Sequence, residues 1–471
     1  MRSARSALGF LLGSMALLLG TTAWRPLRAD PGRPPNVVIL VADDLGWNDV
    51  GFHNPAVKTP NLDRLVSEGL RLDRHYSYPI CSATRAALLT GISTSRTGVN
   101  NASGLDLAYR ILPQDFQAAE YQTWMFGKWH LGGPADYERS GPKYLPHQRG
   151  FDYFHGFLHG AIDYVSHERH DLGQLDWQRN GAPVEESGFT TDLLADDAVK
   201  HLTERDKTRP VLLYLAFNAV HGPLSPPPGT SVNRRDRRPL LLANVSYMDR
   251  AIGRVLDAID REGMRQNTIV LFLSDNGGQL NQGASNDPWR GEKGTVFEGG
   301  IHTPAAIRWP GVIKPGSTSR QVISVIDWYP TLANATKLSV REPSRFDGKD
   351  LWANLIQGKV TPPDGLVIAQ NGTAVFQGPW KLVVGLDRKG GGGQGGRPGE
   401  AKKKARGKGE AAAKKANRQG GKAESTSPLL FRIDDDPEEK TDLAARFPDV
   451  VQELLARGKS MTNLKRRGGK P

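Results

Sequence analysis

Residues 36–44 read "NVVILVADD", a run of aliphatic side chains that ends in two aspartates. A segment that is apolar at every position, and not only at alternate ones, is typical of a strand buried on both faces of a parallel sheet. Three further segments repeat this pattern: 121–130 (YQTWMFGKWH), 210–221 (PVLLYLAFNAVH) and 268–278 (TIVLFLSDNGG). Helical patterns lie between them, as at 59–70 and 247–264. This alternation predicts an α/β fold in which helices cover both faces of the sheet.

The pattern changes near residue 360, where short strands and turns begin and a helix is expected to follow at 447–461. We therefore expect a main domain over residues 30–360 and a small C-terminal α+β domain with an antiparallel sheet over residues 361–471. Inside the small domain, residues 388–427 are rich in Gly, Lys and Ala and lack aromatic residues. Such a segment cannot form a core, so we expect a disordered basic insert within a hairpin.

The net charge of +12 comes from the appendages of the chain. Residues 1–29 carry four arginines, residues 388–427 carry twelve basic and three acidic residues, and residues 459–471 carry five basic ones. These segments contribute +18, so the rest of the chain carries −6. An acidic body and the lack of a nucleic-acid motif argue against a nucleic-acid partner. The basic insert is either a tolerated insertion or an electrostatic tether to a polyanion.

The start of the chain has the layout of a secretory signal peptide over residues 1–29. Arg2 and Arg5 precede an apolar run at 7–19, and small residues allow cleavage after Ala23 or Ala29. The run is shorter than the roughly 20 residues that span a bilayer, so we expect export without stable membrane insertion. An exported chain with the single cysteine Cys81 cannot form an internal disulfide. Cys81 is then either a buried, inert thiol or a chemically special residue.

Each of the four expected strands ends in polar residues. The first ends in Asp43 and Asp44 and the fourth in Asp275 and Asn276, while the second runs into Lys128 and His130 and the third ends at His221. In open α/β sheets, ligands bind at the carboxyl ends of the strands, so these residues predict one composite site. Because Asp43, Asp44, Asp275 and Asn276 offer only oxygen ligands, they favour Ca²⁺, with Mg²⁺ as the alternative, over zinc. A single acid pair at a strand end usually caps a helix or lies in solvent, whereas two such pairs at two strand ends favour a metal site.

Positively charged residues beside a cation indicate that the site also holds an anion. Lys128, His130 and His221 are joined by Lys293 in the segment "WRGEKGTVFEGG". Cys81 begins a helical pattern, where backbone N–H groups favour a negative charge, and Arg85 lies one turn further along the same face. A sulfate or phosphate ester fits this set, with the histidines as proton donors and acceptors.

The chain resembles a type I sulfatase of the alkaline-phosphatase superfamily. Cys81-Ser82-Ala83-Thr84-Arg85 followed by Leu88-Leu89-Thr90-Gly91 is similar to the family signature C-x-(P/A)-x-R…L-x-T-G. The blocks "PNVVILVADDLGWNDVGF", "GKWHLG", "SDNGG" and "RGEKGTVFEGG" resemble other family motifs in the same order. The likeness runs from residue 35 to about 387 and resumes at "LLFRIDDDPEEKTDLA". It implies an alkaline-phosphatase-like large mixed sheet flanked by helices, with residues 30–360 as the sulfatase catalytic domain.

The resemblance also implies roles for individual residues. Cys81 would be converted to formylglycine (3-oxoalanine) by a maturation enzyme, and its hydrate would attack sulfur. Asp43, Asp44, Asp275 and Asn276 would bind Ca²⁺ together with residue 81. Arg85 would hold the formylglycine, Lys128 and Lys293 the sulfate oxygens, His130 the hydrate, and His221 the leaving alcohol. Ala83 stands where proline is commoner in the family, which predicts either less efficient conversion or a particular type of maturation enzyme.

The segment 147–170 resembles the corresponding region of the N-acetylgalactosamine-4-sulfatases (arylsulfatase B type). This implies a sulfated carbohydrate substrate of the galactosamine-4-sulfate type or a related polysaccharide unit. Asp163, Tyr164 and His167 are candidates to line the sugar pocket, and ordinary loop packing is the alternative for all three.

Two other functions remain open at this point. One is a phosphodiesterase or phosphonate monoester hydrolase of the same superfamily, and the other is a non-catalytic exported glycan-binding protein. Export with a single cysteine favours a bacterial periplasm or exterior, because lysosomal members of the family usually carry disulfides.

Overall fold

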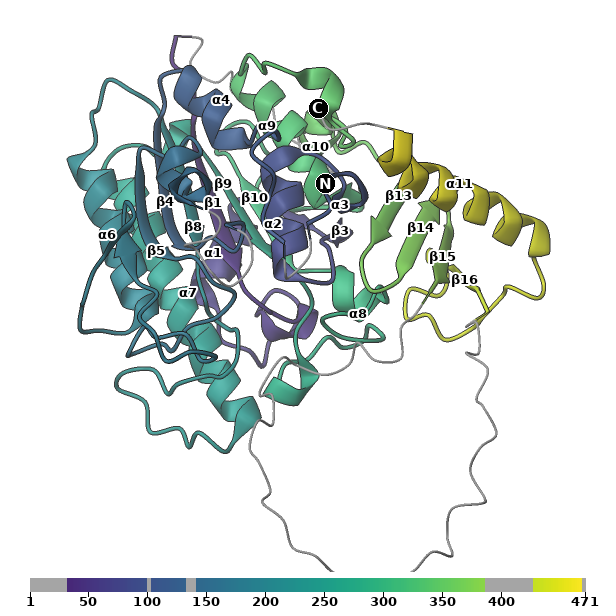
Figure 1. Ribbon diagram of the computed structural model, residues 1–471, viewed down its shortest axis with the longest axis horizontal. Coiled ribbons are helices and arrows are strands. Elements are labelled where there is room, and N and C mark those ends of the chain that lie inside the picture. Colours follow the sequence, from purple (N-terminus) through teal and green to yellow (C-terminus); the bar gives the residue numbers. More distant parts are fainter. Residues whose placement is uncertain (1–31, 100–102, 133–140, 386–426, 468–471) are drawn as a thin grey trace, which may run out of the picture.

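The computed structural model describes residues 32–99, 103–132, 141–385 and 427–467, and its largest element is a ten-stranded mixed sheet (Figure 1). The strand order is β11-β2-β10-β9-β1-β8-β4-β5-β6-β7. Strands β9, β1, β8, β4 and β5 are parallel, and the other strands add antiparallel pairs at both edges, apart from the parallel pair β11–β2. The expected large mixed sheet is therefore confirmed.

The five parallel strands are β9 (Thr268–Ser274), β1 (Asn36–Ala42), β8 (Val211–Ala216), β4 (Gln122–Lys128) and β5 (Tyr153–Phe157). The edge strands are β2 (Leu70–Leu72), β6 (Gln178–Arg179), β7 (Ala182–Pro183), β10 (Ala305–Arg308) and β11 (Ser317–Ser319). A separate pair joins β3 (His75–Tyr76) to β12 (Ile323–Ser324). Every residue of β1, β8, β4 and β9 is buried, as their continuous apolar pattern predicts.

Helices cover both faces of this sheet, and successive residues of β1 pack alternately against the helices of one face and those of the other. Val37, Ile39 and Val41 belong to a core with α2 and α9, whereas Val38 and Leu40 belong to a core with α6 and α7. The helices are α1 (Pro60–Ser67), α2 (Cys81–Thr90), α3 (Thr94–Thr97), α4 (Leu112–Ala118), α6 (Thr190–Glu204), α7 (Arg237–Arg261), α8 (Glu298–Ile301), α9 (Trp328–Thr336), α10 (Trp352–Gln357) and α11 (Pro448–Arg467).

The C-terminal part of the chain forms a second, antiparallel sheet of four strands. These are β13 (Asp364–Ala369), β14 (Thr373–Gln377), β15 (Trp380–Val384) and β16 (Leu429–Arg432), in that order. Helix α11 lies on the outer face of this sheet (Figure 1). Val367, Val375 and Leu382 pack toward α11, whereas Ile368 and Phe376 belong to the core of the large sheet. The small sheet is thus sandwiched between α11 and the main body.

Some of the segments predicted from the sequence lie outside the described residues, and the predicted division into domains stays a prediction. The signal peptide at 1–29 and nearly all of the insert at 388–427 are outside the described ranges. We retain 30–360 and 361–471 as a proposed division into domains. Among the described helices, none is both long enough and apolar enough to cross a bilayer. The helix expected at 247–264 begins ten residues earlier, at Arg237.

Candidate active site

Two acidic turns meet at the carboxyl edge of the parallel strands. Asp43 and Asp44 follow β1, and Asp275 and Asn276 follow β9, whose last residue lies beside Ala42 in the sheet register. The Asp275 N–H donates to the Ala42 carbonyl at 3.0 Å, and the Asp44 N–H donates to Asp275 Oδ1 at 3.3 Å. Asp44 has φ of +61°, so the chain leaves the strand direction there and presents both carboxylates to one side.

Cys81 is the first residue of α2, and its side chain meets the two acidic turns. Its Sγ, one oxygen of Asp43 and one of Asp275 all lie within 4.8 Å of one another. Arg85, one turn along, donates from Nη2 to Asp275 Oδ2 at 2.7 Å and from Nη1 to the Lys128 carbonyl at 2.8 Å. The only cysteine of the chain is therefore buried at the composite site.

The oxygen atoms at this site fit a hard cation. Asn276 donates from Nδ2 to Asp44 Oδ1 at 2.7 Å and to the Gly277 carbonyl at 2.9 Å, which turns its Oδ1 the other way. Asn276 Oδ1 and Asp43 Oδ1 are both buried and have no hydrogen-bond partner among the described residues. Buried oxygens without donors are what a divalent ion with oxygen ligands would satisfy. The residues present therefore fit such an ion.

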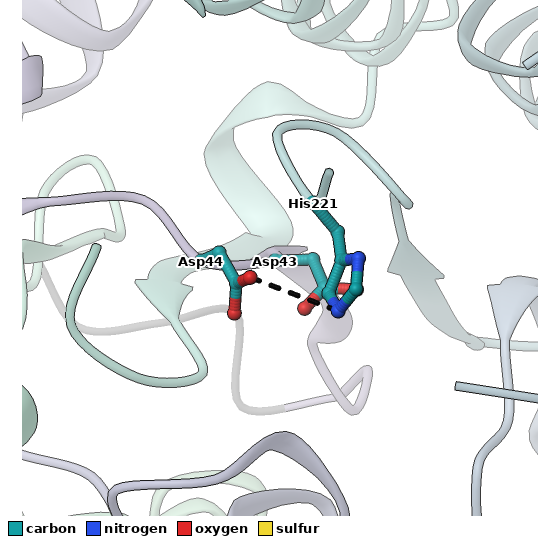
Figure 2. A group of neighbouring side chains, drawn as sticks. All are labelled: Asp43, Asp44 and His221. Carbon is teal, nitrogen blue, oxygen red and sulfur yellow. Dashed lines mark ion pairs between the residues drawn. The ribbon is translucent and has the colours of Figure 1, made fainter. Parts of the chain in front are cut away.

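Two lysines and a histidine surround the carboxylates. Lys128 Nζ lies 2.6 Å from Asp43 Oδ2, and Lys293 Nζ lies 2.8 Å from each oxygen of Asp44. His221 points at the same group, with Nε2 3.7 Å from Asp44 Oδ2 (Figure 2). Its Nδ1 lies 2.6 Å from the Gly222 carbonyl, which holds the ring in place.

His130 lies beside this group. Its backbone, at φ of +55°, donates to the Leu158 carbonyl at 3.1 Å. Its Nδ1 has no hydrogen-bond partner in the described part of the chain, and burial lowers the pKa of the ring below its ordinary value.

The electrostatics of the site follow from burial and close charges. Burial and the Asp43 carboxylate raise the pKa of Asp275 to about 6. Burial acts the same way on Asp44, but Lys293 and His221 outweigh it and hold its pKa below the ordinary range. Burial raises the pKa of the Cys81 thiol, although Lys128 and Lys293 oppose this. An unmodified Cys81 would thus stay protonated at neutral pH and be a poor nucleophile.

The three sugar-pocket candidates make contacts within the protein. The Tyr164 hydroxyl donates to the carbonyls of Asn218 and His221 at 3.0 and 2.9 Å, and its ring is buried. His167 is buried and stacks on Trp177. Asp163 accepts from the N–H groups of Val165 and Ser166, at 2.8 and 2.9 Å, in a turn. These contacts favour packing for Tyr164 and His167, and Tyr164 holds the backbone of His221.

Two residues that the sequence analysis did not single out also shape the site. Ser274 Oγ accepts from the Leu45 N–H at 3.1 Å and donates to the Asn276 carbonyl at 2.9 Å, so it joins the two acidic turns. Asp176 accepts from the N–H groups of Leu158 and His159. Leu158 is the residue whose carbonyl accepts from the His130 N–H, so Asp176 fixes the backbone that holds His130. The signal for Ser274 is its position directly before the acid pair. Asp176 carries no local signal, because its partners lie 17 and 18 residues away.

Comparisons with known proteins show which family this chain resembles. A family model described as Sulfatase matches residues 35–338. Mouse arylsulfatase J is 32% identical over 469 residues, covering 90% of this chain and 75% of that protein. Mouse N-acetylgalactosamine-6-sulfatase is 33% identical over 379 residues, covering 73% of this chain and 70% of that protein.

A solved structure resembles the whole described fold. The crystal structure of Ps i-CgsB in complex with k-i-k-neocarrahexaose superposes with a TM-score of 0.76 at 26% identity. The match covers 93% of this chain and 95% of that one, so the likeness includes the small C-terminal sheet as well as the large one.

Proposed function

This chain belongs to the sulfatase family, and we propose that its substrate is a galactosamine-sulfate unit, or a related unit, of a polysaccharide. As a family member it is a sulfuric ester hydrolase that acts on sulfated carbohydrates. The observation that carries the reaction, hydrolysis of a sulfate ester, is the meeting of Cys81 with Asp43 and Asp275 within 4.8 Å, beside the cationic side chains of Arg85, Lys128 and Lys293. Water and the ester R–O–SO₃⁻ give the alcohol R–OH, sulfate and a proton.

The cationic side chains supply binding and charge stabilisation. Lys128 and Lys293 are proposed to hold sulfate oxygens, because each Nζ lies 2.6 or 2.8 Å from a carboxylate of the site that fixes its position. Arg85 holds Asp275 and the Lys128 backbone and thereby orients residue 81. His221 is proposed to deliver or orient the proton at the leaving oxygen through Nε2, since its Nδ1 is held by the Gly222 carbonyl. His130 is proposed to exchange a proton with residue 81. Preorganised charges of this kind are usually the largest source of rate.

We propose that Asp43, Asp44, Asp275 and Asn276 hold Ca²⁺, with Mg²⁺ as the alternative. The unpartnered oxygens of Asp43 and Asn276 support this choice. When bound, the ion would offset negative charge on the sulfuryl oxygens and on residue 81.

Cys81 is proposed to act as formylglycine, which offers a hydrated aldehyde oxygen as the nucleophile in place of a protonated thiol. The raised pKa of the thiol supports a modified residue. The test is the mass of the tryptic peptide 75–85, HYSYPICSATR, from protein made in its native host. Conversion lowers this mass by about 18 Da. An intact thiol throughout an active preparation would contradict the proposal.

The chain needs a formylglycine-generating maturation enzyme as a partner, and Ala83 makes the yield of conversion a quantity to measure. A Cys81→Ala variant is the control, because it keeps the fold and removes the nucleophile. We also propose export, to a bacterial periplasm or exterior, from the pattern of residues 1–29.

The position of the sulfate is tested separately from the reaction. The segment 147–170 supports a galactosamine-4-sulfate, while a relative named N-acetylgalactosamine-6-sulfatase supports the same sugar with another position. Sulfate release should be measured from N-acetylgalactosamine 4-sulfate, from its 6-sulfate, and from oligosaccharides that carry each. We expect the 4-sulfate to have the higher kcat/KM. A preference for the 6-sulfate would correct the position, and release from neither would reject the sugar.

A further inference from the structure

A buried charge cluster joins the small C-terminal sheet to the main body. It consists of Glu298 in α8, Lys381 in β15 and Glu439 after β16, and all three side chains are buried. Lys381 Nζ lies 2.7 Å from Glu298 Oε1 and 2.7 Å from Glu439 Oε1. The Tyr76 hydroxyl donates to Glu298 Oε2 at 3.0 Å, and His302 Nδ1 lies 2.8 Å from the same oxygen. One lysine of the small sheet therefore bridges two carboxylates from different parts of the chain.

Glu439 contacts both ends of the loop that carries Lys293. At one end, its backbone carbonyl accepts from Arg290 Nη1 at 3.1 Å. At the other end, its carboxylate oxygen Oε2 accepts from the Glu298 N–H at 2.8 Å. The Gly299 N–H also donates to the Arg290 carbonyl at 2.6 Å, which closes the base of the loop. Residues 290–298 are thus held at their base by a residue that lies more than 140 positions later.

The loop and helix α8, which follows it, are tied to the two other parts of the site. The Gly294 N–H donates to the Pro79 carbonyl at 2.8 Å, two residues before Cys81. The Gly277 N–H, next to Asn276, donates to the Gly300 carbonyl at 3.0 Å. A shift of α8 or of the loop would therefore move Lys293 relative to residue 81 and the acidic turns.

Attachment of the small sheet does not need buried charges. Ile368, Ala374 and Phe376 already pack into the core of the main body. Burying a lysine with two carboxylates carries a desolvation penalty that apolar packing would avoid. Glu439 also has φ of +57°, a backbone conformation that non-glycine residues adopt rarely and that often marks a functional constraint. The cluster therefore calls for a role besides attachment.

We propose that Lys381 and Glu439 are positioning residues that hold the loop 290–298, and with it Lys293, at the distance required to bind the sulfate group. The small C-terminal sheet would then complete the active site without touching the substrate. This inference rests on the proposed role of Lys293 at the sulfate.

The test compares Lys381→Met with Leu382→Ala. These neighbours point to opposite faces of β15, because side chains alternate along a strand. Leu382 is fully buried in the core that the small sheet forms with α11. We therefore expect its truncation to destabilise the small sheet and to leave the ion pairs of Lys381 in place. Both variants, Lys293→Ala and the wild type are purified and titrated with inorganic sulfate by calorimetry. Sulfate release from the best substrate is measured at a temperature well below each melting temperature.

We expect Lys381→Met to bind sulfate at least about fivefold more weakly and to lose at least about tenfold in kcat/KM, as small misplacements of binding groups do. Leu382→Ala should lower the melting temperature by at least as much as Lys381→Met does. Its affinity for sulfate and its kcat/KM should nevertheless stay within about twofold of the wild type. If Leu382→Ala loses as much sulfate affinity as Lys381→Met, or if folded Lys381→Met binds sulfate like the wild type, the inference is wrong.

A second variant covers the case in which Lys381→Met does not fold. Glu439→Gln keeps the size of the side chain and an oxygen for the Glu298 N–H, but replaces the carboxylate that lies 2.7 Å from Lys381 Nζ with a neutral amide. We expect weaker sulfate binding by about threefold or more, and unchanged binding in a folded protein would overturn the proposal. If Lys293→Ala binds sulfate as the wild type does, the proposed role of Lys293 fails first, and the two failures are thereby distinguished.

Discussion

At the scale of the residue, Asn276 offers the sharpest test of the metal. Its Nδ2 donates hydrogen bonds to Asp44 and to the Gly277 carbonyl, whereas its buried Oδ1 has no hydrogen-bond donor among the described residues. We expect chelation to remove sulfate release and Ca²⁺ to restore it. Asn276→Ala should need at least about tenfold more Ca²⁺ for half-maximal activity, because the loss of a supporting oxygen weakens metal binding. Activity and melting temperature are followed during a Ca²⁺ titration.

Asn286→Ala is the matched control. This buried asparagine lies ten residues after Asn276, and both ends of its amide have hydrogen-bond partners. Its Oδ1 accepts from the Gly278 N–H, and its Nδ2 donates to the Gly278 carbonyl. It should lower the melting temperature and leave the Ca²⁺ midpoint where it is in the wild type. Equal midpoints for Asn276→Ala and the wild type would exclude Asn276 as a ligand.

Single residues differ in how well they can be predicted. Asp43, Asp44, Asp275 and Asn276 could be brought together from the sequence, because parallel strands carry whatever follows them to the same edge. Tyr164 and His167 could not be assigned in this way. Their burial depends on contacts with Asn218 and Trp177, which lie in other segments of the chain.

At the scale of the element, strand β4 delivers Lys128 only because Gly127 allows a close approach to β8. Gly127 has φ of +97°, and a Cβ there would lie 1.9 Å from the Ala216 carbonyl oxygen. We expect Gly127→Ala to lose roughly 3 kcal/mol or more of folding free energy, since it combines backbone strain with a backbone clash. Urea unfolding measures this loss. Gly132→Ala is the control, because its Cβ would meet Trp129 at an ordinary 3.7 Å, and a similar loss there would contradict the explanation.

Helix α6 is fastened to β5 by Asp197, and this contact predicts a dependence of stability on pH. Its Oδ2 accepts from the Tyr153 hydroxyl at 2.8 Å and lies 2.7 Å from His155 Nδ1, and Oδ1 lies 3.2 Å from His201 Nδ1. Burial would raise the pKa of Asp197, but His155 and His201 outweigh it and hold the pKa well below its ordinary value. The folded state therefore gives up this proton more readily than the unfolded chain.

A lowered pKa in the folded state contributes stability above the ordinary aspartate pKa of about 3.9, and this contribution disappears as the pH falls through and below it. We expect Asp197→Asn to lower the melting temperature at pH 7 and to flatten its decrease between about pH 5 and 3. The neighbouring Asp196, whose side chain is 65% exposed in an ion pair with Arg254, gives the control Asp196→Asn. A slope that is unchanged in Asp197→Asn would refute the assignment.

The long buried elements could be predicted, and the short or edge elements could not. The four apolar runs became β1, β4, β8 and β9 because burial on both faces leaves a continuous apolar pattern. Helix α7 was expected only from residue 247. Its first residues, Arg237, Arg238 and Pro239, are a start without a capping side chain. The residues after them are buried at helical spacing, as Leu241, Val245 and Met248 are, and this signal was available in the sequence. Strands of two or three residues, such as β2 and β3, depend on their partners alone.

At the scale of the whole molecule, the small sheet is part of the active-site architecture as well as an appendage. Its strands β14 and β15 face α11 with one set of side chains and the main core with the other. The separate pattern after residue 360 could be recognised in the sequence. The ion pairs of Lys381 with Glu298 and Glu439 could not, because the three residues stand far apart and each resembles an ordinary charged residue in the sequence.

The segment between β15 and β16 differs in charge from the rest of the chain. Residues 388–427 carry a net charge of +9, whereas the chain without its appendages carries −6. Strands β15 and β16 pair directly, with Val383 beside Leu429, so a short turn is enough to connect them. Replacing residues 386–426 with a four-residue Gly-Ser turn should therefore leave the fold and the hydrolysis of a monosaccharide sulfate within about twofold of the wild type.

The effect of the deletion should depend on the length and charge of the substrate. Against a sulfated polysaccharide we expect KM to rise several-fold at low salt, because a positive segment raises the local concentration of a polyanion. The difference should vanish at about 0.5 M NaCl, where charges more than a few ångströms apart are screened. A variant that keeps the length of the segment but carries Gln in place of its Lys and Arg residues separates charge from length. If that variant has the same KM as the wild type at low salt, the segment is a tolerated insertion. If it matches the deletion, the segment is an electrostatic tether that acts on the substrate before the active site does.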